Sequence, residues 1–211
     1  GVPEKYITGN ASDWEKFEKW SETVPKTIRN PLYHWTHLEL KRPFGISDRL
    51  LSKDSAKSIW EDCNAKLATD DFSTKGIVKQ MNVETICTTD DPVDSLEYHK
   101  AIAEQKDFTV AVLPAFRPDK GMMIDQPEIF LPWIKKLAEV TDTDIKNYER
   151  FLEAIRKRHD FFHQNGCSLS DHGLENMYAE DYTESEIKVI FEKAVTGKAV
   201  SAEEALKFKS A

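Results

Sequence analysis

Cysteine is scarce in this chain, whose 211 residues include three of them, Cys63, Cys87 and Cys167. Their number is odd, they lie far apart, and their spacing matches neither a zinc site nor a disulfide framework. We therefore expect reduced thiols and a cytoplasmic location. Cys87 and Cys167 fall within short apolar runs, so we expect both to be small core residues.

Long apolar runs and a basic stripe are also missing. No stretch approaches the roughly 20 apolar residues of a membrane-spanning helix, and the first residues do not resemble a signal peptide. The net charge is −8 and the pI is near 5.3, which disfavours nucleic acid as a partner. Hydrophobic residues make up 40% and charged residues 31%. We therefore expect a soluble globular protein with neither a membrane nor a nucleic-acid partner.

An initiator methionine is missing as well, because the first residues are Gly-Val-Pro-Glu. The last residues, KFKSA, fall within an expected helix. We therefore expect the chain to be an internal segment of a longer protein.

Helical periodicity dominates the region 1–81. Ser12 and Glu15 form a capping-box pattern ahead of a run with apolar residues on one face. Pro31 is well placed to open the next helix, since proline is tolerated in a first helical turn. Helices are expected at about 12–24, 31–42, 54–67 and 74–81.

The region 82–211 instead alternates apolar strand-like runs with helical patterns. Strands are expected at about 83–88, 109–113 and 167–169, and helices at about 93–105, 128–140 and 143–164. Two more helices open with the capping boxes of Thr183 with Glu186 and of Ser201 with Glu204. This alternation predicts an α/β fold with parallel strands. The near-continuous apolar runs predict a sheet that is covered on both faces.

Each expected strand ends in a polar cluster, at residues 88–91, 116–120 and 170–173. Because the carboxyl ends of parallel strands meet at one edge, where ligands bind in such folds, we expect these clusters to converge. The residues concerned are Asp90, Asp91, Arg117, Asp119, Asp171 and His172. Among them, Arg117 suits a carboxylate or phosphate ligand, since its guanidinium can bind two oxygens at once.

Purely structural roles remain open for the same residues. Polar residues end most strands because loops are solvated, and Asp90 or Asp91 could simply cap the following helix. Asp171 could pair with Arg117 in the absence of any ligand. The pattern alone does not choose between these roles and ligand binding.

Two histidine pairs have spacings that are compatible with metal binding on a helix. His159 and His163 are four residues apart, but they lack the glutamate of the HExxH motif, and no third ligand is evident. His34 and His37 lie among aromatic residues. For His159 and His163 we favour a solvated or packed face over metal binding, and for His34 and His37 we favour packing. We expect His99 to be a surface residue of its helix.

Four motifs, in order along the chain, together resemble those of the uronate isomerase (glucuronate isomerase) family. They are NPLYHWTHLELKRPFGI (30–46), QMNVETICTTDDPVDSLEYH (80–99), LPAFRPDK (113–120) and NGCSLSDHGL (165–174). The resemblance implies the amidohydrolase superfamily and a (β/α)8 TIM-like barrel. Residues 1–81 would form a helical insertion, and 82–211 would supply about three parallel barrel strands with their helices.

The same resemblance implies the activity. The family interconverts D-glucuronate with D-fructuronate, and D-galacturonate with D-tagaturonate. It implies a divalent metal, usually zinc, whose ligands would lie outside this chain, and leaves the catalytic residues of this segment unknown. Arg117 matches an arginine that contacts the substrate carboxylate. Asp90, Asp119, Asp171 and His172 match motif positions and are further candidates for substrate binding.

Two other interpretations stay open. Three strands cannot close an eight-stranded barrel, so the chain by itself could be a non-catalytic structural fragment. Alternatively, the intact protein could be another metal-dependent member of the superfamily that catalyses hydrolysis. The sequence allows a homo-oligomer but does not specify one.

Overall fold

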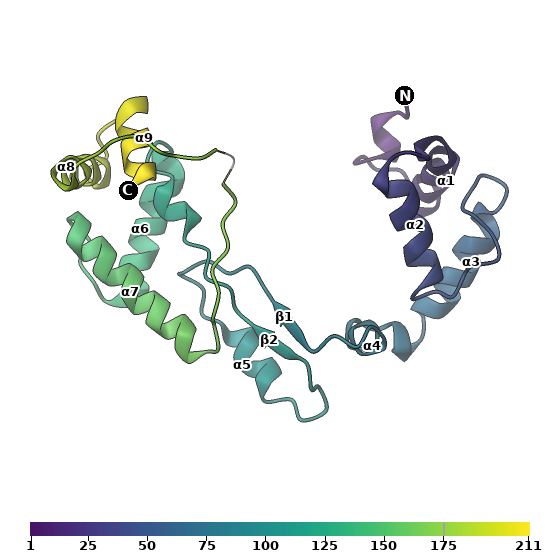
Figure 1. Cartoon of the computed structure of the whole chain (residues 1–211). Helices are drawn as coiled ribbons and strands as arrows, with labels where there is room; N and C mark the ends of the chain where they lie inside the picture. The colour runs from purple at the N-terminus through teal and green to yellow at the C-terminus, as the bar shows by residue number, and fades with distance from the viewer. Residues whose placement is uncertain (175) are drawn as a thin grey trace. The chain divides into compact units, whose positions relative to one another are not determined.

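The computed structural model describes residues 1–174 and 176–211, and the chain divides into two compact units, Gly1–Val83 and Glu84–Ala211 (Figure 1). This division falls two residues beyond the expected limit of the helical region at residue 81. Each unit has a hydrophobic core of its own.

The first unit is made of helices. They are the 3₁₀ helix Glu4–Tyr6, α1 (Asp13–Thr23), the 3₁₀ helix Val24–Thr27, α2 (Pro31–Lys41), α3 (Ala56–Leu67), the 3₁₀ helix Asp70–Phe72 and α4 (Thr74–Gln80). All four expected helices are therefore present, with limits within two residues of those predicted. Their core consists of Val24, Leu40, Ile46, Leu51 and Ile59.

Local hydrogen bonds explain where these helices begin. The backbone N–H of Glu15 donates to Ser12 Oγ at 3.3 Å, and the N–H of Ser12 donates back to Glu15 Oε2 at 2.9 Å. The capping box predicted before α1 is therefore confirmed. In α2, His37 bonds the carbonyl of Tyr33 at 2.7 Å and accepts from the N–H of Leu51 at 3.0 Å. His37 thus fixes the loop that follows α2, which is the packing role that its aromatic setting suggested.

The second unit combines a short sheet with longer helices. They are β1 (Thr85–Cys87), α5 (Glu97–Ala103), β2 (Ala111–Leu113), the 3₁₀ helix η4 (Asp119–Met122), α6 (Pro127–Thr141), α7 (Tyr148–Gln164), α8 (Glu184–Val195) and α9 (Ala202–Ser210). The strands β1 and β2 pair in parallel, with Ile86 opposite Val112. The predicted α/β class and parallel pairing are therefore confirmed.

The prediction of a third strand at 167–169 is wrong. This segment makes one parallel bridge, between Phe116 and Ser170, through the N–H of Phe116 and the carbonyl of Leu169 at 3.2 Å. In a longer parallel pairing with the 167–171 segment, the N–H groups of residues 114 and 118 would donate the next hydrogen bonds on either side of Phe116. Both positions are proline. Because proline has no N–H, neither position can donate a hydrogen bond that would lengthen this pairing.

Burial of the strands also differs from the expectation. Thr85, Cys87 and Ala111 are exposed, so the sheet is not covered on both faces, and the prediction of a buried Cys87 is wrong. The reason is that two three-residue strands offer little surface for helices to cover, and α5 is the helix that packs against β2. Cys167 is buried as predicted.

Two helices begin later than the sequence predicted. The chain before α5 forms a turn in which the N–H of Asp94 donates to the carbonyl of Asp91, and Leu96 then takes a left-handed conformation with φ of 57°. Before α7, Asn147 accepts a hydrogen bond from the N–H of Arg150 at 3.0 Å and so caps the helix. These local bonds compete with helix formation over the preceding residues.

Gly166 ends α7 as predicted. Its φ of 92° is a left-handed conformation that glycine adopts at little cost, and its N–H donates to the carbonyl of His163 at 3.0 Å. A Cβ atom at this position would lie 2.9 Å from a methyl group of Leu113. Glycine is therefore needed here both for the backbone turn and for the close approach to β2.

The main core of the second unit lies among α6, α7, α8 and α9. Its centre is the fully buried Phe191, whose ring lies 5.1 Å from that of Phe151 and 6.1 Å from that of Phe130. A smaller core of Leu96, Phe116, Phe162 and Cys167 lies beneath the strand ends. Over the described residues, no helix combines the length and apolarity that a membrane crossing requires.

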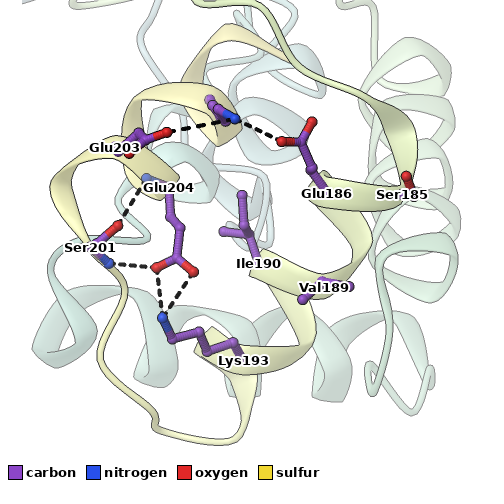
Figure 2. A pocket seen from close by; sticks show the side chains of 9 residues that line it. Ser185, Glu186, Val189, Ile190, Lys193, Ser201, Glu203 and Glu204 are labelled. Atoms are coloured by element: carbon purple, nitrogen blue, oxygen red, sulfur yellow. Dashed lines mark hydrogen bonds and ion pairs between the residues drawn. The ribbon is translucent and has the colours of Figure 1, made fainter.

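A cavity of about 600 Å³ lies between α8 and α9 (Figure 2). The charged groups around it are paired with one another: Lys193 bonds both carboxylate oxygens of Glu204, and Lys207 bonds Glu186 at 2.7 Å. Lys207 and the capping hydroxyl of Thr183 lower the pKa of Glu186 to about 2. Because the charges already satisfy each other, we interpret this cavity as part of the helix–helix junction and not as a ligand site.

Phe191→Ala is expected to lower the free energy of unfolding by about 3–5 kcal/mol, because it removes a ring from a fully packed site and leaves a cavity. Val189→Ala is the matched control on the same helix, since Val189 is 63% exposed, and should change stability by less than about 0.5 kcal/mol. Urea unfolding followed by circular dichroism measures both. Equal effects of the two substitutions would contradict this description of the core.

Glu186→Gln is expected to destabilise the protein in a pH-dependent way. Because the folded pKa of Glu186 lies below its ordinary value, its charge stabilises the fold fully above about pH 4.5, and this stabilisation disappears as the pH falls towards 2. The difference in unfolding free energy between wild type and variant should therefore shrink over this range. Glu203→Gln is the control, because Glu203 contacts Lys207 from an exposed position at 3.7 Å. If the difference in unfolding free energy between wild type and Glu186→Gln does not change with pH, the lowered pKa of Glu186 is contradicted.

Candidate functional site

Three polar segments lie side by side at the carboxyl end of the short sheet. The N–H of Asp90 donates to the carbonyl of Ala115, and the N–H of Arg117 donates to the carbonyl of Asp90, both at 3.1 Å. On its other side Phe116 bridges to Ser170. The predicted convergence of the segments 88–91, 116–120 and 170–173 is therefore confirmed at the backbone, with Phe116 in the middle.

Arg117 and Asp171 form a two-pronged ion pair at this edge. Nε of Arg117 donates to Oδ1 of Asp171 at 3.1 Å, and Nη2 donates to Oδ2. The hydrogen bonds from the guanidinium hold the pKa of Asp171 below its ordinary value, so this carboxylate is charged at neutral pH. Arg117 and Asp171 thus pair in the absence of a ligand, which is one of the roles that the sequence left open.

The ion pair is nevertheless open to solvent. The side chain of Arg117 is 35% exposed and that of Asp171 is 41% exposed. The hydrogen bonds of the described residues use Nε and Nη2, so the Nη1 edge of the guanidinium is left for another group. An anionic ligand could therefore reach Arg117 without first breaking its contact with Asp171.

Asp119, His172 and Ser170 form a second array beside this pair. Oδ1 of Asp119 lies 2.9 Å from Nδ1 of His172, and Nε2 of His172 lies 2.9 Å from Oγ of Ser170. The other oxygen of Asp119 accepts from the N–H of Gly173 at 2.7 Å. The imidazole is therefore held in one orientation, between a carboxylate and a hydroxyl.

Both arrays join the segment 117–119 to the segment 171–173. In the first, the basic side chain (Arg117) belongs to 117–119 and the carboxylate (Asp171) to 171–173, and in the second the carboxylate (Asp119) belongs to 117–119 and the imidazole (His172) to 171–173. Arg117 and Asp119 also interact electrostatically, since the charge of Asp119 contributes to the raised pKa of Arg117 after the larger effect of Asp171. Four of the predicted residues, Arg117, Asp119, Asp171 and His172, thus form one charged cluster, which we call the strand-end cluster.

Asp90, the fifth predicted residue, faces the interior of its own strand end. Its Oδ2 accepts from the hydroxyl of Thr88 at 2.6 Å and from the N–H of Ala115 at 3.2 Å, and its side chain is 13% exposed. His99 bonds the same Thr88 hydroxyl at 2.7 Å and is 12% exposed. The prediction that His99 is a surface residue is therefore wrong, because α5 packs against β2 and turns it towards the strand end.

Asp91 serves a turn and not a helix. Its Oδ1 accepts from the N–H of Val93 at 3.1 Å and from the indole N–H of Trp133 at 2.7 Å, and its Oδ2 pairs with Lys120 at 3.0 Å. The N-cap of α5 is Leu96, so neither Asp90 nor Asp91 caps that helix. Asp91 instead fastens the 91–94 turn to α6.

Two cavities border the strand-end cluster. One, of about 240 Å³, is lined by Asp119 and Gly173 together with Met122, Met123, Gln126, Leu174, Tyr178 and Lys209. The other, of about 420 Å³, is lined by Phe116 and Ser170 together with His159, His163, Cys167, Ser168 and Leu169. A small polar molecule therefore has room on either side of the Ser170–His172–Asp119 array.

The described residues do not form a metal site. No group of three His, Cys, Asp or Glu side chains in 1–174 and 176–211 is arranged to hold an ion. His163 contacts the carbonyl of Cys167 at 3.3 Å, and the ring of His159 lies edge-on to Phe116 at 5.7 Å. These contacts, and the 65% exposure of the His159 side chain, agree with the solvated or packed face favoured for this pair.

Ser170 is the site residue that the sequence interpretation missed. Its signal was the spacing Ser-x-His at 170 and 172, which places both side chains on one side of an extended segment. A polar residue at the end of an expected strand is common in solvated loops, so the sequence pattern gives Ser170 no particular role. The structure assigns it a contact with His172.

Known proteins match the whole of this chain. The family model described as glucuronate isomerase matches residues 1–211. The uronate isomerases of Cellvibrio japonicus and Bacteroides thetaiotaomicron are 56% and 54% identical to it, and the chain spans about 45% of the length of each. All of the chain also superimposes on 46% of the crystal structure of uronate isomerase from Thermotoga maritima, with a TM-score of 0.90 and 35% identity.

Proposed function

We infer the function from one premise: the chain belongs to the glucuronate isomerase family. We propose that the whole protein interconverts D-glucuronate with D-fructuronate, and D-galacturonate with D-tagaturonate, as an aldose–ketose isomerase. The observation that carries the assignment of a site in this chain is the guanidinium of Arg117, presented at the convergent strand ends with an open edge.

Arg117 is proposed to bind the substrate carboxylate. A uronate carries this negative charge throughout the reaction, so a fixed guanidinium can orient the sugar without taking part in bond making. Asp171 holds Arg117 through Nε and Nη2, which fixes the direction of the remaining edge. Arginine is suited to this task because its planar group stays charged and matches the geometry of a carboxylate.

The remaining cluster residues are proposed to contact the sugar or to position Arg117. Asp119 and His172 could exchange hydrogen bonds with hydroxyl groups of the substrate, because Asp119 lines a cavity and the imidazole of His172 is 41% exposed. Asp171 acts through Arg117. The contacts of Asp90 support a bracing role at the end of β1 in preference to direct contact with substrate.

Isomerisation moves a proton between C2 and C1 and develops negative charge on the sugar oxygens. Such charge requires fixed donors or a metal ion, and the base requires a pKa near the working pH. The resemblance to the family suggests a divalent ion, zinc being our proposal, whose ligands lie outside these residues. The residues of 1–174 and 176–211 do not themselves form a metal site, so their proposed roles concern the substrate.

The roles assigned to this chain are binding and orientation. We accordingly propose that residues 1–211 by themselves do not isomerise uronates, because the two short strands and two isolated bridges of the described residues supply only part of an enclosed site. Hydrolysis by a related metal enzyme is disfavoured by the family assignment. The cytoplasm remains our proposed compartment.

Arg117→Ala in the whole protein is expected to lower kcat/KM for D-glucuronate by about ten- to a thousandfold, because the substrate carboxylate loses its charged partner. Arg117→Lys should recover part of this loss, since it restores the charge without the two-pronged geometry. Arg150→Ala is the matched control, because Arg150 pairs with Glu153 on the exposed side of α7. Steady-state kinetics decide the matter, and wild-type kinetics for Arg117→Ala would remove Arg117 from the site.

A further inference from the structure

The imidazole of His172 has a protein partner at each ring nitrogen. Its Nδ1 lies 2.9 Å from Oδ1 of Asp119, and its Nε2 lies 2.9 Å from Oγ of Ser170. Because a carboxylate oxygen can only accept, Nδ1 donates to Asp119. A hydroxyl group of the substrate could therefore bind a ring nitrogen only by displacing one of these partners, at the cost of an existing hydrogen bond.

Asp119 fastens two consecutive residues of the opposite segment. Its Oδ1 holds the ring of His172, and its Oδ2 accepts from the N–H of Gly173 at 2.7 Å. The side chain of Asp119 is 19% exposed, so this carboxylate is mostly surrounded by protein. Both residues that follow Asp171 in the chain are thus tied to one carboxylate, an arrangement that we call the Asp119 clamp.

The segment 171–174 has no backbone ladder to hold it. The N–H of Phe116 donates to the carbonyl of Leu169 at 3.2 Å, just before this segment. Residues 171–174 themselves make no backbone–backbone hydrogen bond with any described residue. Asp171 therefore lies between a backbone bridge on one side and the Asp119 clamp on the other.

The position of Asp171 sets the direction of the Arg117 guanidinium. The backbone of Arg117 is fixed by its own N–H, which donates to the carbonyl of Asp90 at 3.1 Å. Its long side chain still has many rotamers, and the two hydrogen bonds to Asp171 select one of them. Because Asp171 is next to His172 in the chain, release of the clamp would let the carboxylate move, and the guanidinium with it.

We propose that His172 is a positioning residue. Its ring, held by Asp119 and Ser170, keeps the neighbouring Asp171 against Arg117, so that the guanidinium keeps the direction in which it binds the substrate carboxylate. The proposal rests on the proposed function, because Arg117 must be the group that binds this carboxylate. The clamp acts through geometry, and it requires neither a change of charge on the imidazole nor a cavity beside Arg117.

The test is a double-mutant cycle in the whole protein, with kcat/KM for D-glucuronate as the quantity measured. His172→Ala is expected to lower kcat/KM by about three- to thirtyfold, because a misdirected guanidinium orients the substrate less well. In an Arg117→Ala background the same substitution should change kcat/KM by less than about twofold, because no guanidinium is left to direct.

The difference between the two backgrounds separates positioning from its alternatives. If His172 bound a sugar hydroxyl directly, its substitution would lower kcat/KM by the same factor with and without Arg117. A loss that came only from a smaller folded fraction would also be the same in both backgrounds. Equal factors would therefore overturn the proposal, and so would wild-type kinetics for His172→Ala.

Conservative variants identify the contact that matters. His172→Asn places a side-chain N–H near the position of Nδ1, so it should recover most of the lost kcat/KM. His172→Gln has its amide farther out, near the position of Nε2, and should not. If the Asn variant is no more active than the Gln variant, the contact with Asp119 is not the one that positions the site.

Two further variants complete the design. Ser170→Ala should lower kcat/KM less than His172→Ala, because the bond between Nδ1 and Asp119 remains. His159→Ala is the matched control, since this histidine is 65% exposed, and it should behave as wild type. His172→Gln takes the place of His172→Ala in the cycle if the alanine variant does not fold.

Failure of the positioning role and failure of the proposed function give different results. If Arg117→Ala lowers kcat/KM and the His172 substitution acts equally in both backgrounds, only the positioning role falls. If Arg117→Ala has wild-type kinetics, or if the whole protein does not isomerise D-glucuronate, both fall.

Discussion

The backbone of Phe116 is the constraint on which the candidate site depends. Its neighbours bond to Asp90 on one side, and its own N–H bonds to the 169–170 segment on the other, so one residue holds three chain segments in register. Its ring is buried against Phe162, which anchors this junction to α7. Pro114 and Pro118 on either side have no N–H with which to extend the pairing towards the 169–170 segment. Beyond Arg117, side chains make the contacts between these segments.

Side chains take over where the ladder stops. Arg117 reaches across to Asp171, and Asp119 reaches across to His172 and to the N–H of Gly173. Ion pairs that are a third or more exposed contribute little to stability, so their value lies in geometry. They fix the direction of a guanidinium and of an imidazole, as binding of a small charged molecule requires.

Helices were predicted well because their signals are local. Capping boxes at Ser12, Thr183 and Ser201 and the glycine at 166 marked boundaries that the structure reproduces. Errors arose where non-local contacts decide the outcome. The sequence could not tell that Cys87 would be left exposed or that α5 would turn His99 onto Thr88. Burial and partners of this kind depend on how elements pack, which hydrophobic periodicity does not encode.

The sequence by itself determined the helices, the parallel α/β class, the family and the set of polar residues that meet at one edge, because each follows from short-range patterns or from motif matches. Only the tertiary structure decided how these residues pair. It placed Asp171 on Arg117, joined Ser170 to His172 and Asp119, and turned Asp90 inward. The contacts of Asp171 with Arg117 and of His172 with Asp119 join side chains more than 50 residues apart in the chain. Their geometry is set by the register of the strand ends and by two prolines whose effect shows only once the neighbouring segment is in place.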